Sequence, residues 1–307
     1  MHHLVNRYGK SISALFLLLT VFWLFILIIL PNIALIESSF RPYLPLNEID
    51  GPRDVYTLAN YQRFLATPVG FDVFGMSTNV PIHLRIFITT VLYSIFVTTM
   101  ILIIGYPAAY YMTKTISPSN MALFFIVLTV PMWVSEILRS FAWFTILSFK
   151  GPLNALLIEM GVINSEVRWI RGYNGIIIGL VYTYMLFMVF PLYSSMQSLD
   201  KNQIEAAQDL GASWWRTHWR VIVPHCKPGI VSGCVMVFML SAGSLLVPSL
   251  LGSPNSLWFT QTIQQLMLEA LDWNTGAAYS LLFLILCTFV VVAMMWAFKV
   301  KLSDITN

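Results

Sequence analysis

Charge and cysteine are both scarce in this sequence. Asp, Glu, Lys and Arg together make up 10% of the 307 residues, whereas 58% are hydrophobic. Soluble globular proteins carry about 25% charged residues. The composition therefore excludes a water-soluble enzyme, a nucleic-acid-binding protein and a disulfide-stabilised secreted domain. The net charge of +3 is also too small to indicate a polyanionic partner.

The missing charge leaves long apolar runs. Residues 11–36, 86–113 and 172–199 contain no Asp, Glu, Lys or Arg, and about 20 apolar residues are enough to cross a bilayer. We predict an all-α integral membrane protein with one transmembrane domain over residues 1–307. Its six helices are expected at about residues 11–36, 86–113, 119–148 with an interruption, 172–199, 228–251 and 273–298.

Basic residues indicate the orientation, because short loops rich in Lys and Arg stay in the cytoplasm. The segments that share a side with both termini contain 9 basic residues in 54, and the opposite segments contain 8 in 106. Acidic residues number 4 and 10 in the same two groups. We therefore expect both termini in the cytoplasm, together with the segment 200–227 between the fourth and fifth spans.

The few cysteines and histidines suggest no disulfide and no metal site. Cys226, Cys234 and Cys287 lie in or beside the last two spans, away from the oxidising side of the membrane. His218 and His225 lie near Cys226 but lack the paired spacing of zinc motifs. The HExxH motif of zinc proteases is absent, and no paired acids occupy span centres, so an intramembrane enzyme is disfavoured.

Two ionisable residues, Glu136 and Arg139, are expected within the third span. Being three residues apart, they would lie one helical turn from each other. One interpretation is a mutually neutralised ion pair. The other is that Glu136 faces a solute path, because ionisable groups within a membrane often mark such paths.

The segment 200–227 has the pattern of two short helices. Asp200 and Gln203 have capping-box spacing, and Gly211 would end the first helix. Ser213 would begin a second helix, and Pro224 would stop it. The apolar positions expected to share a face are Ile204, Ala207 and Leu210 in the first helix, and Trp215, Trp219 and Ile222 in the second.

The first of these helices carries an acidic surface. Glu205 and Asp209 are four residues apart, a like-charge pair that a basic partner surface would offset. A solvated acidic face beside a membrane-lying tryptophan stripe is the alternative. The spacing Glu205-Ala206-Ala207, three residues, Gly211, and then Val221, Val223 and Pro224 resembles the EAA signature of permease subunits in bacterial ABC importers. Valines replace the usual Ile and Leu of that signature.

The likeness extends over roughly residues 60–300 to the permeases of spermidine/putrescine transport systems, the B-type subunit in particular. Similar stretches also occur in relatives that move opines, aminoethylphosphonate or ferric ion. The stretches that carry the resemblance are TLANYQRFL at 57–65, GYPAAYYM at 105–112, the run from Pro131 through EILRSFAW to KGPLN at 150–154, the run 189–213 and DWNTGAA at 272–278.

This resemblance implies a type I ABC importer permease of the bacterial inner membrane, with a coupling helix between spans four and five. It implies no enzymatic activity and no cofactor in this chain, since ATP and Mg would be bound by a partner ATPase dimer. Further implied partners are a second permease subunit, expected to be a paralogous C-type chain, and an extracytoplasmic substrate-binding protein. The implied coupling residues are Glu205, Ala206, Ala207, Asp209 and Gly211.

A polyamine would need carboxylates and aromatic faces, because these hold an ammonium group. The candidates in spans three and four are Trp133, Glu136, Trp143, Tyr182, Tyr184 and Phe187. For each aromatic residue, ordinary packing or an interfacial belt is the alternative. A stand-alone secondary carrier is the competing class of protein, and it would call for a mid-membrane ionisable cluster or an inverted repeat.

Overall fold

A computed structural model of the chain describes residues 2–45, 48, 51–66, 68–73, 76–170 and 172–300. Within these residues, five helices are long and apolar enough to cross a membrane. A sixth span results if Trp214–His225 and Lys227–Ala242, which meet at a bend of 66°, count as one. The predicted helical membrane fold is thereby confirmed. The five helices are Ala14–Phe40, Ile82–Lys114, Glu136–Glu159, Asn174–Gln197 and Trp273–Phe298.

The chain divides into two compact units. The first consists of Met1–Ile82 with Ile263–Ile285, and the second of His83–Thr262 with Leu286–Asn307. The elements of the first unit are α1 (His2–Leu24), η1 (Phe25–Ile29, a π-helix), α2 (Leu30–Phe40), α3 (Ala59–Ala66), β1 (Pro68–Val73), β2 (Met76–Pro81), η3 (Gln265–Glu269) and the first half of α15 (Trp273–Phe298).

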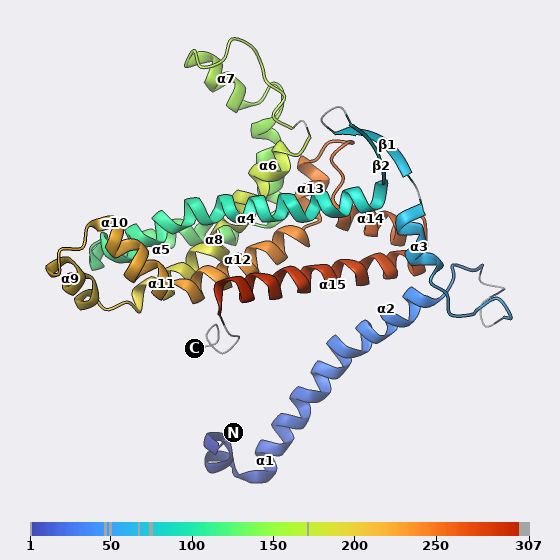
Figure 1. Cartoon of the computed structure of the whole chain (residues 1–307), viewed down its shortest axis with the longest axis horizontal. Helices are drawn as coiled ribbons and strands as arrows, with labels where there is room; N and C mark the ends of the chain where they lie inside the picture. Colours follow the sequence, from blue (N-terminus) through green and yellow to red (C-terminus); the bar gives the residue numbers. More distant parts are fainter. Residues whose placement is uncertain are drawn as a thin grey trace. The chain divides into compact units, whose positions relative to one another are not determined.

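The first span is a nearly continuous helix that packs little against its own unit. In the window that defines this span, no residue is buried inside the chain (Figure 1). The π-helical turn η1 ends two residues before Pro31, whose ring nitrogen cannot donate a backbone hydrogen bond. The side-chain amide of Asn32 instead donates to the carbonyl oxygen of Ile28 at 2.7 Å.

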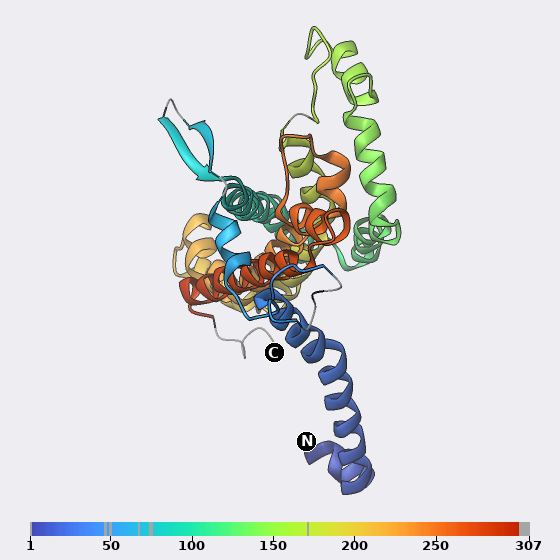
Figure 2. The ribbon, with the colours of Figure 1, turned by 90° about the vertical axis from the view of Figure 1, so that its right-hand side faces the viewer.

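A β-hairpin follows α3, in addition to the predicted helices. β1 and β2 pair antiparallel, with Pro68 opposite Pro81 and Val73 opposite Met76. Figure 2 shows the hairpin as a separate two-stranded ribbon. In the sequence, Val69, Phe71 and Val73 alternate with Gly70 and Asp72, which is the period-two pattern of a strand. That signal was present but too short to stand out among the long helical runs.

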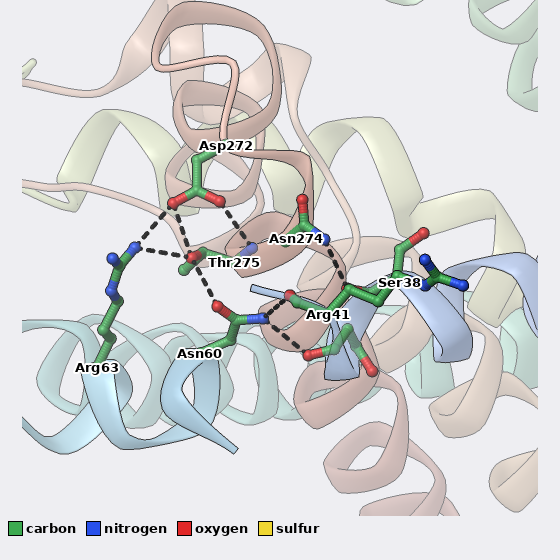
Figure 3. Close-up of polar contacts among 8 residues, drawn as sticks. Ser38, Arg41, Asn60, Arg63, Asp272, Asn274 and Thr275 are labelled. Carbon is green, nitrogen blue, oxygen red and sulfur yellow. Dashed lines mark hydrogen bonds and ion pairs between the residues drawn. The ribbon is translucent and has the colours of Figure 1, made fainter. Parts of the chain in front are cut away.

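A buried polar network holds the first unit together (Figure 3). Asn60 on α3 is 2% exposed, and its amide nitrogen donates to the carbonyl oxygens of Ser39 at 2.9 Å and Arg41 at 2.8 Å. Asp272 caps the start of α15 by accepting from the backbone nitrogen of Thr275 at 3.0 Å. Arg63 also donates to Asp272, at 3.0 Å. The stretches TLANYQRFL and DWNTGAA therefore meet in this network.

The second unit is a helical bundle built around α8, which packs between α4 and α12 (Figure 1). Its elements are α4 (Ile82–Lys114), α5 (Pro118–Trp133), α6 (Glu136–Leu147), α7 (Pro152–Glu159), α8 (Asn174–Gln197), α9 (Lys201–Asp209), α10 (Trp214–Thr217), η2 (His218–Ile222, a π-helix), α11 (Val223–His225), α12 (Lys227–Ala242), α13 (Leu246–Leu251), α14 (Phe259–Gln264) and the remainder of α15.

Glycines allow the close approach of α12 to α8. A Cβ atom on Gly229 would lie 2.6 Å from the carbonyl oxygen of Pro191 and 2.5 Å from Cβ of Ser195. A Cβ atom on Gly233 would lie 2.7 Å from the sulfur of Met188. Small residues at such crossings are the usual basis of helix packing within membranes, because they maximise van der Waals contact between backbones.

The third predicted span is interrupted, as expected. α5 ends at Trp133 and α6 begins at Glu136, with Val134 and Ser135 between them in extended conformation. Beyond α6, the side chain of Asn154 orders the following loop. It donates to the carbonyl oxygens of Phe149 and Val167, each at 2.8 Å, and accepts from the Val167 backbone nitrogen and the Trp169 indole. All four of its hydrogen-bonding positions are therefore used.

Candidate functional site

A break between α12 and α13 shapes the candidate site. α12 ends at Ala242, and α13 begins at Leu246. The indole nitrogen of Trp258, which is fully buried, donates to the carbonyl oxygens of Ser241 at 3.2 Å and Ala242 at 3.1 Å. Thr260 donates to the carbonyl oxygen of Ser244 at 2.6 Å. A helix end in an apolar environment requires such partners, so these two side chains stabilise the break.

A pocket of about 270 Å³ lies beside this break. Glu136, the first residue of α6, lines it together with Tyr184 of α8. The hydroxyl of Tyr184 donates to Oε1 of Glu136 at 3.2 Å. A negative charge at the start of a helix is favoured by the helix dipole. The other lining residues are Met239, Leu240, Gly243, Ser244, Leu245 and Leu246.

Glu136 and Arg139 do not form the ion pair that their spacing suggested. Within the described residues, the ion pairs involve other partners, and Nε of Arg139 is buried without a hydrogen bond. The interpretation of a neutralised pair is therefore wrong. Ser244 also has a buried hydroxyl without a hydrogen-bond partner in the part of the chain that the structure describes. The pocket thus combines a carboxylate with polar groups that a ligand can engage.

The remaining aromatic candidates fall into separate places. Phe187 lies next to Tyr184, with ring centroids 6.2 Å apart. Trp143 and Tyr182 form a second pair at 5.3 Å. Trp133, at the end of α5, is 81% exposed and does not line the pocket. Sequence reasoning found Glu136 and Tyr184 but missed Ser244 and Trp258. Pro248 signals a disturbed helix in this apolar run, but it does not identify the side chains that stabilise the break.

The acidic segment forms a short helix, α9, that is open to its surroundings. Its N-cap is Asp200, whose carboxylate accepts from the backbone nitrogen of Asn202 at 3.0 Å. Gly211 follows its end with φ +77°, and the backbone nitrogen of Ala212 donates to the carbonyl oxygen of Ala207 at 3.0 Å. This is the Schellman termination that glycine favours. No residue of α9 is buried, and Glu205, Ala206 and Asp209 are exposed.

Two details of this segment differ from the predicted amphipathic pattern. Ile204 is partly buried against the core, but Leu210 is 89% exposed. Trp215 and Trp219 are 65% and 63% exposed, whereas Ile222 is buried. The expected shared face is therefore wrong for Leu210, and in the second helix Ile222 does not share the exposure of the two tryptophans. The π-helical turn η2 changes the angular spacing in the second helix, and Leu210 extends from the terminating turn.

Helical spans with an accessible short helix between the fourth and fifth define a membrane transport subunit. A family described as "Binding-protein-dependent transport system inner membrane component" matches residues 101–300, which include α9 and the EAA-like signature. The chain belongs to this family, whose members are non-enzymatic components of the bacterial inner membrane.

Named relatives agree with this assignment. The chain is 37% identical over 259 residues to the spermidine/putrescine transport system permease protein PotB of Salmonella typhimurium (strain SL1344), covering 84% of each sequence. It is 36% identical to PotB of Escherichia coli (strain K12), covering 84% of this chain and 88% of that protein. It is 28% identical to the inner membrane ABC transporter permease protein YdcU of Escherichia coli (strain K12), over 64% and 62% of the two chains.

Solved structures share the fold at low identity. A bacterial ABC transporter involved in the import of the acidic polysaccharide alginate matches with a TM-score of 0.66, 17% identity and 96% coverage of both chains. The MetNI methionine ABC transporter, in inward-facing conformations, matches with a TM-score of 0.51 and 15% identity, over 70% of this chain and 92% of that one. These similarities establish the type I importer permease fold.

Proposed function

We propose that this chain is the transmembrane permease subunit of an ABC importer that carries a polyamine, such as putrescine or spermidine, across the inner membrane. The observation that carries the solute assignment is the carboxylate of Glu136 in a pocket beside a helix break, without an ion-pair partner among the described residues. The PotB relatives, which cover most of the chain, support the same solute class.

The pocket suits one ammonium group. Glu136 would form an ion pair with it, and the hydroxyl oxygens of Tyr184 and Ser244 would accept hydrogen bonds from its remaining N–H groups. The C-terminal end of α12 carries a partial negative charge that also favours a cation. Cation–π contacts of about 0.5–2 kcal/mol each would continue the path. The proposed path residues are Trp133, Glu136, Trp143, Tyr182, Tyr184 and Phe187.

Other solutes of the same importer class fit this pocket less well. Opines and aminoethylphosphonate carry amines, but their acidic groups would meet the carboxylate of Glu136. Ferric ion prefers several oxygen and carboxylate ligands, and the pocket lining has one carboxylate. These solutes remain the alternatives that an uptake assay must include.

The movement that drives transport would be transmitted to this chain through α9. Glu205, Ala206, Ala207, Asp209 and Gly211 are proposed to dock into a partner ATPase dimer, which binds ATP and Mg, so that this chain holds no cofactor of its own. The support is that no residue of α9 is buried and that the apolar side chain of Leu210 is exposed beside its acidic groups. Closure of the ATPase dimer would then switch the permease between inward- and outward-facing states.

The remaining partners follow from the same class. We infer a second permease subunit of the paralogous C-type, an extracytoplasmic substrate-binding protein and a cytoplasmic location for both termini. The distribution of basic residues supports this orientation. A structural neighbour is an alginate ABC transporter in complex with a pentasaccharide-bound periplasmic protein, with 17% identity and a TM-score of 0.65.

Copurification and uptake test this proposal. The chain, coexpressed with its partner subunits, is expected to bring down an ATPase and a second permease, whereas a stand-alone secondary carrier would purify alone. Glu205→Arg is expected to abolish both ATPase association and uptake of labelled putrescine and spermidine while the chain remains in the membrane. Normal association and uptake in this variant would refute the coupling role of α9. Uptake of an opine or phosphonate instead of a polyamine would refute the solute assignment alone.

A further inference from the structure

Force applied to α9 reaches the helices of the second unit by different routes. α8 ends at Gln197 and α12 begins at Lys227, so both are covalently continuous with the segment 198–226 that contains α9. α4 ends at Lys114, which is 85 positions before Leu199. The movement of α4 therefore depends on noncovalent contacts with this segment.

One stripe of α4 provides such contacts. Tyr106, Tyr110 and Lys114 are four residues apart and thus lie on one face of the helix. Lys114 Nζ donates to the carbonyl oxygen of Leu199, just before α9, at 3.2 Å. The hydroxyl of Tyr106 and Nε2 of His218, which follows α9 in the chain, are 2.7 Å apart. α4 is thereby attached to the segment on both sides of α9.

His218 is held firmly at its contact with α4. The residue is 7% exposed, and its ring stacks on Trp214 with centroids 4.8 Å apart. The rings of Tyr106 and Tyr110 meet it edge to face, at centroid distances of 5.4 and 5.2 Å. Closely packed aromatic rings leave little free space between them. A displacement of His218 would therefore displace Tyr106 and Tyr110 with it.

The other nitrogen of this imidazole argues against a role in packing alone. Nδ1 of His218 is buried and has no hydrogen-bond partner within the described part of the chain. A buried polar atom without a partner destabilises a fold. A phenyl ring would fill a similar space without this cost. The feature that a phenyl ring would lack is the hydrogen bond between His218 and Tyr106.

We propose that the contact of His218 with Tyr106 transmits the movement of α9 to α4, so that both are positioning residues for transport. This inference rests on the proposed docking of α9 to the ATPase. It assigns to α4 a direct mechanical connection with the docking segment, in addition to its packing against α8 through Gly105.

The test uses the complete importer in proteoliposomes, with its partner subunits, ATPase and loaded binding protein. Tyr106→Phe and His218→Phe are expected to retain ATPase association and ATP hydrolysis, with a melting temperature lowered by at most about 5 °C. The amount of putrescine or spermidine transported per ATP is expected to fall about fivefold. This is the effect expected when the free energy that couples two conformational states is reduced by about one neutral hydrogen bond. Tyr111→Phe is the matched control, because Tyr111 lies on the same helix, is 49% exposed and makes no contact with His218.

A second readout is independent of the solute. An environment-sensitive fluorophore on Ile103→Cys, at an exposed position of α4, is expected to change its emission when ATP and vanadate are added. The change in emission should be smaller than in the otherwise unaltered chain when Tyr106→Phe or His218→Phe is also present. It should be undiminished when Tyr111→Phe is present.

The outcomes separate this inference from the proposed function. Unchanged transport per ATP and an unchanged fluorescence response in both variants would overturn the transmission role. A loss of ATPase association together with a large fall in melting temperature in Tyr106→Phe would also overturn it. The contact would then be needed only for the folding of the loop. Glu205→Arg is measured in parallel. If that variant transports normally, the proposed docking of α9 fails, whatever the two aromatic variants show.

Discussion

The hydroxyl of Tyr184 donates a hydrogen bond to Glu136 Oε1 at 3.2 Å and joins two helices whose contacting residues are 48 positions apart. The bond fixes the carboxylate at the start of α6 against the central helix α8. A carboxylate held in place before its ligand arrives loses less conformational entropy on binding. In the proposed function, the pair would present a preorganised acceptor for a cation at the edge of the α12 break.

Removal of the Glu136 charge is expected to impair uptake. In Glu136→Gln the shape of the side chain is kept, but the interaction with an ammonium loses its charge. Because a charged hydrogen bond contributes about 1.5–3 kcal/mol, the apparent affinity for a polyamine should fall roughly tenfold or more. Tyr184→Phe should give a smaller loss. The measurement is the concentration dependence of putrescine and spermidine uptake.

The matched control for this prediction is Glu159→Gln, the same change at an exposed position at the end of α7. It should leave uptake unchanged. If Glu136→Gln and Glu159→Gln have indistinguishable uptake kinetics, Glu136 does not face the solute.

Of the eight residues that line this pocket, two, Glu136 and Tyr184, could be predicted from the sequence. Glu136 stood out because charge is rare in the spans, and Tyr184 because aromatic residues suit a cation. Ser244 was not found, although Pro248 in the run 228–251 has no N–H to donate to the carbonyl oxygen of Ser244 and so signals a disturbed helix there. The break depends on Trp258 and Thr260, which donate to carbonyl oxygens 16 or 17 positions earlier. Contacts between residues so far apart in the sequence are set by tertiary packing. The periodicity of apolar residues along the sequence carries no information about them.

The end of α9 is expected to depend on backbone conformation alone. Gly211 has φ +77°, and a Cβ atom added there would meet no atom within 4 Å. Asn tolerates this left-handed region, whereas a β-branched residue does not. Gly211→Asn should therefore retain ATPase association, and Gly211→Val should weaken it by about 1–2 kcal/mol or more. Copurification of the ATPase at increasing salt concentration measures the difference. Equal association of both variants would show that this conformation is unnecessary for docking.

Local signals predicted α9 well because its ends are defined by local chemistry. Asp200 caps it and Gly211 terminates it, and both roles follow from residue type and spacing. Leu210 was placed on the wrong face, because the helix unwinds at this residue and its side chain leaves the helical periodicity. The network around Asn60 was not predicted at all. In the sequence, Asn60 is about 20 residues from its partners Ser39 and Arg41 and more than 200 residues from its partner Thr275.

Asn60 is expected to be essential for the stability of the first unit. Asn60→Asp keeps the size of the side chain but replaces the donating amide with an oxygen, which would face the carbonyl oxygens of Ser39 and Arg41. Each buried carbonyl left unpaired costs about 1–3 kcal/mol. The melting temperature in detergent should fall by roughly 5 °C or more. Gln62→Glu, the corresponding change at an exposed position of α3, should have no such effect, and an equal fall in both would exclude a specific role for the network.

The helix break at Gly243 is expected to depend on the indole nitrogen of Trp258. Trp258→Phe keeps an aromatic ring but removes the donor to the carbonyl oxygens of Ser241 and Ala242. Two unpaired carbonyls in an apolar environment favour continuation of the helix through residues 243–245, which would move Ser244 away from Glu136. We expect a loss of stability of about 1–3 kcal/mol together with reduced polyamine uptake. Trp296→Phe is the control, because Trp296 is 83% exposed. A Trp258→Phe variant that is less stable yet transports normally would mean that the break supports the fold without shaping the solute pocket.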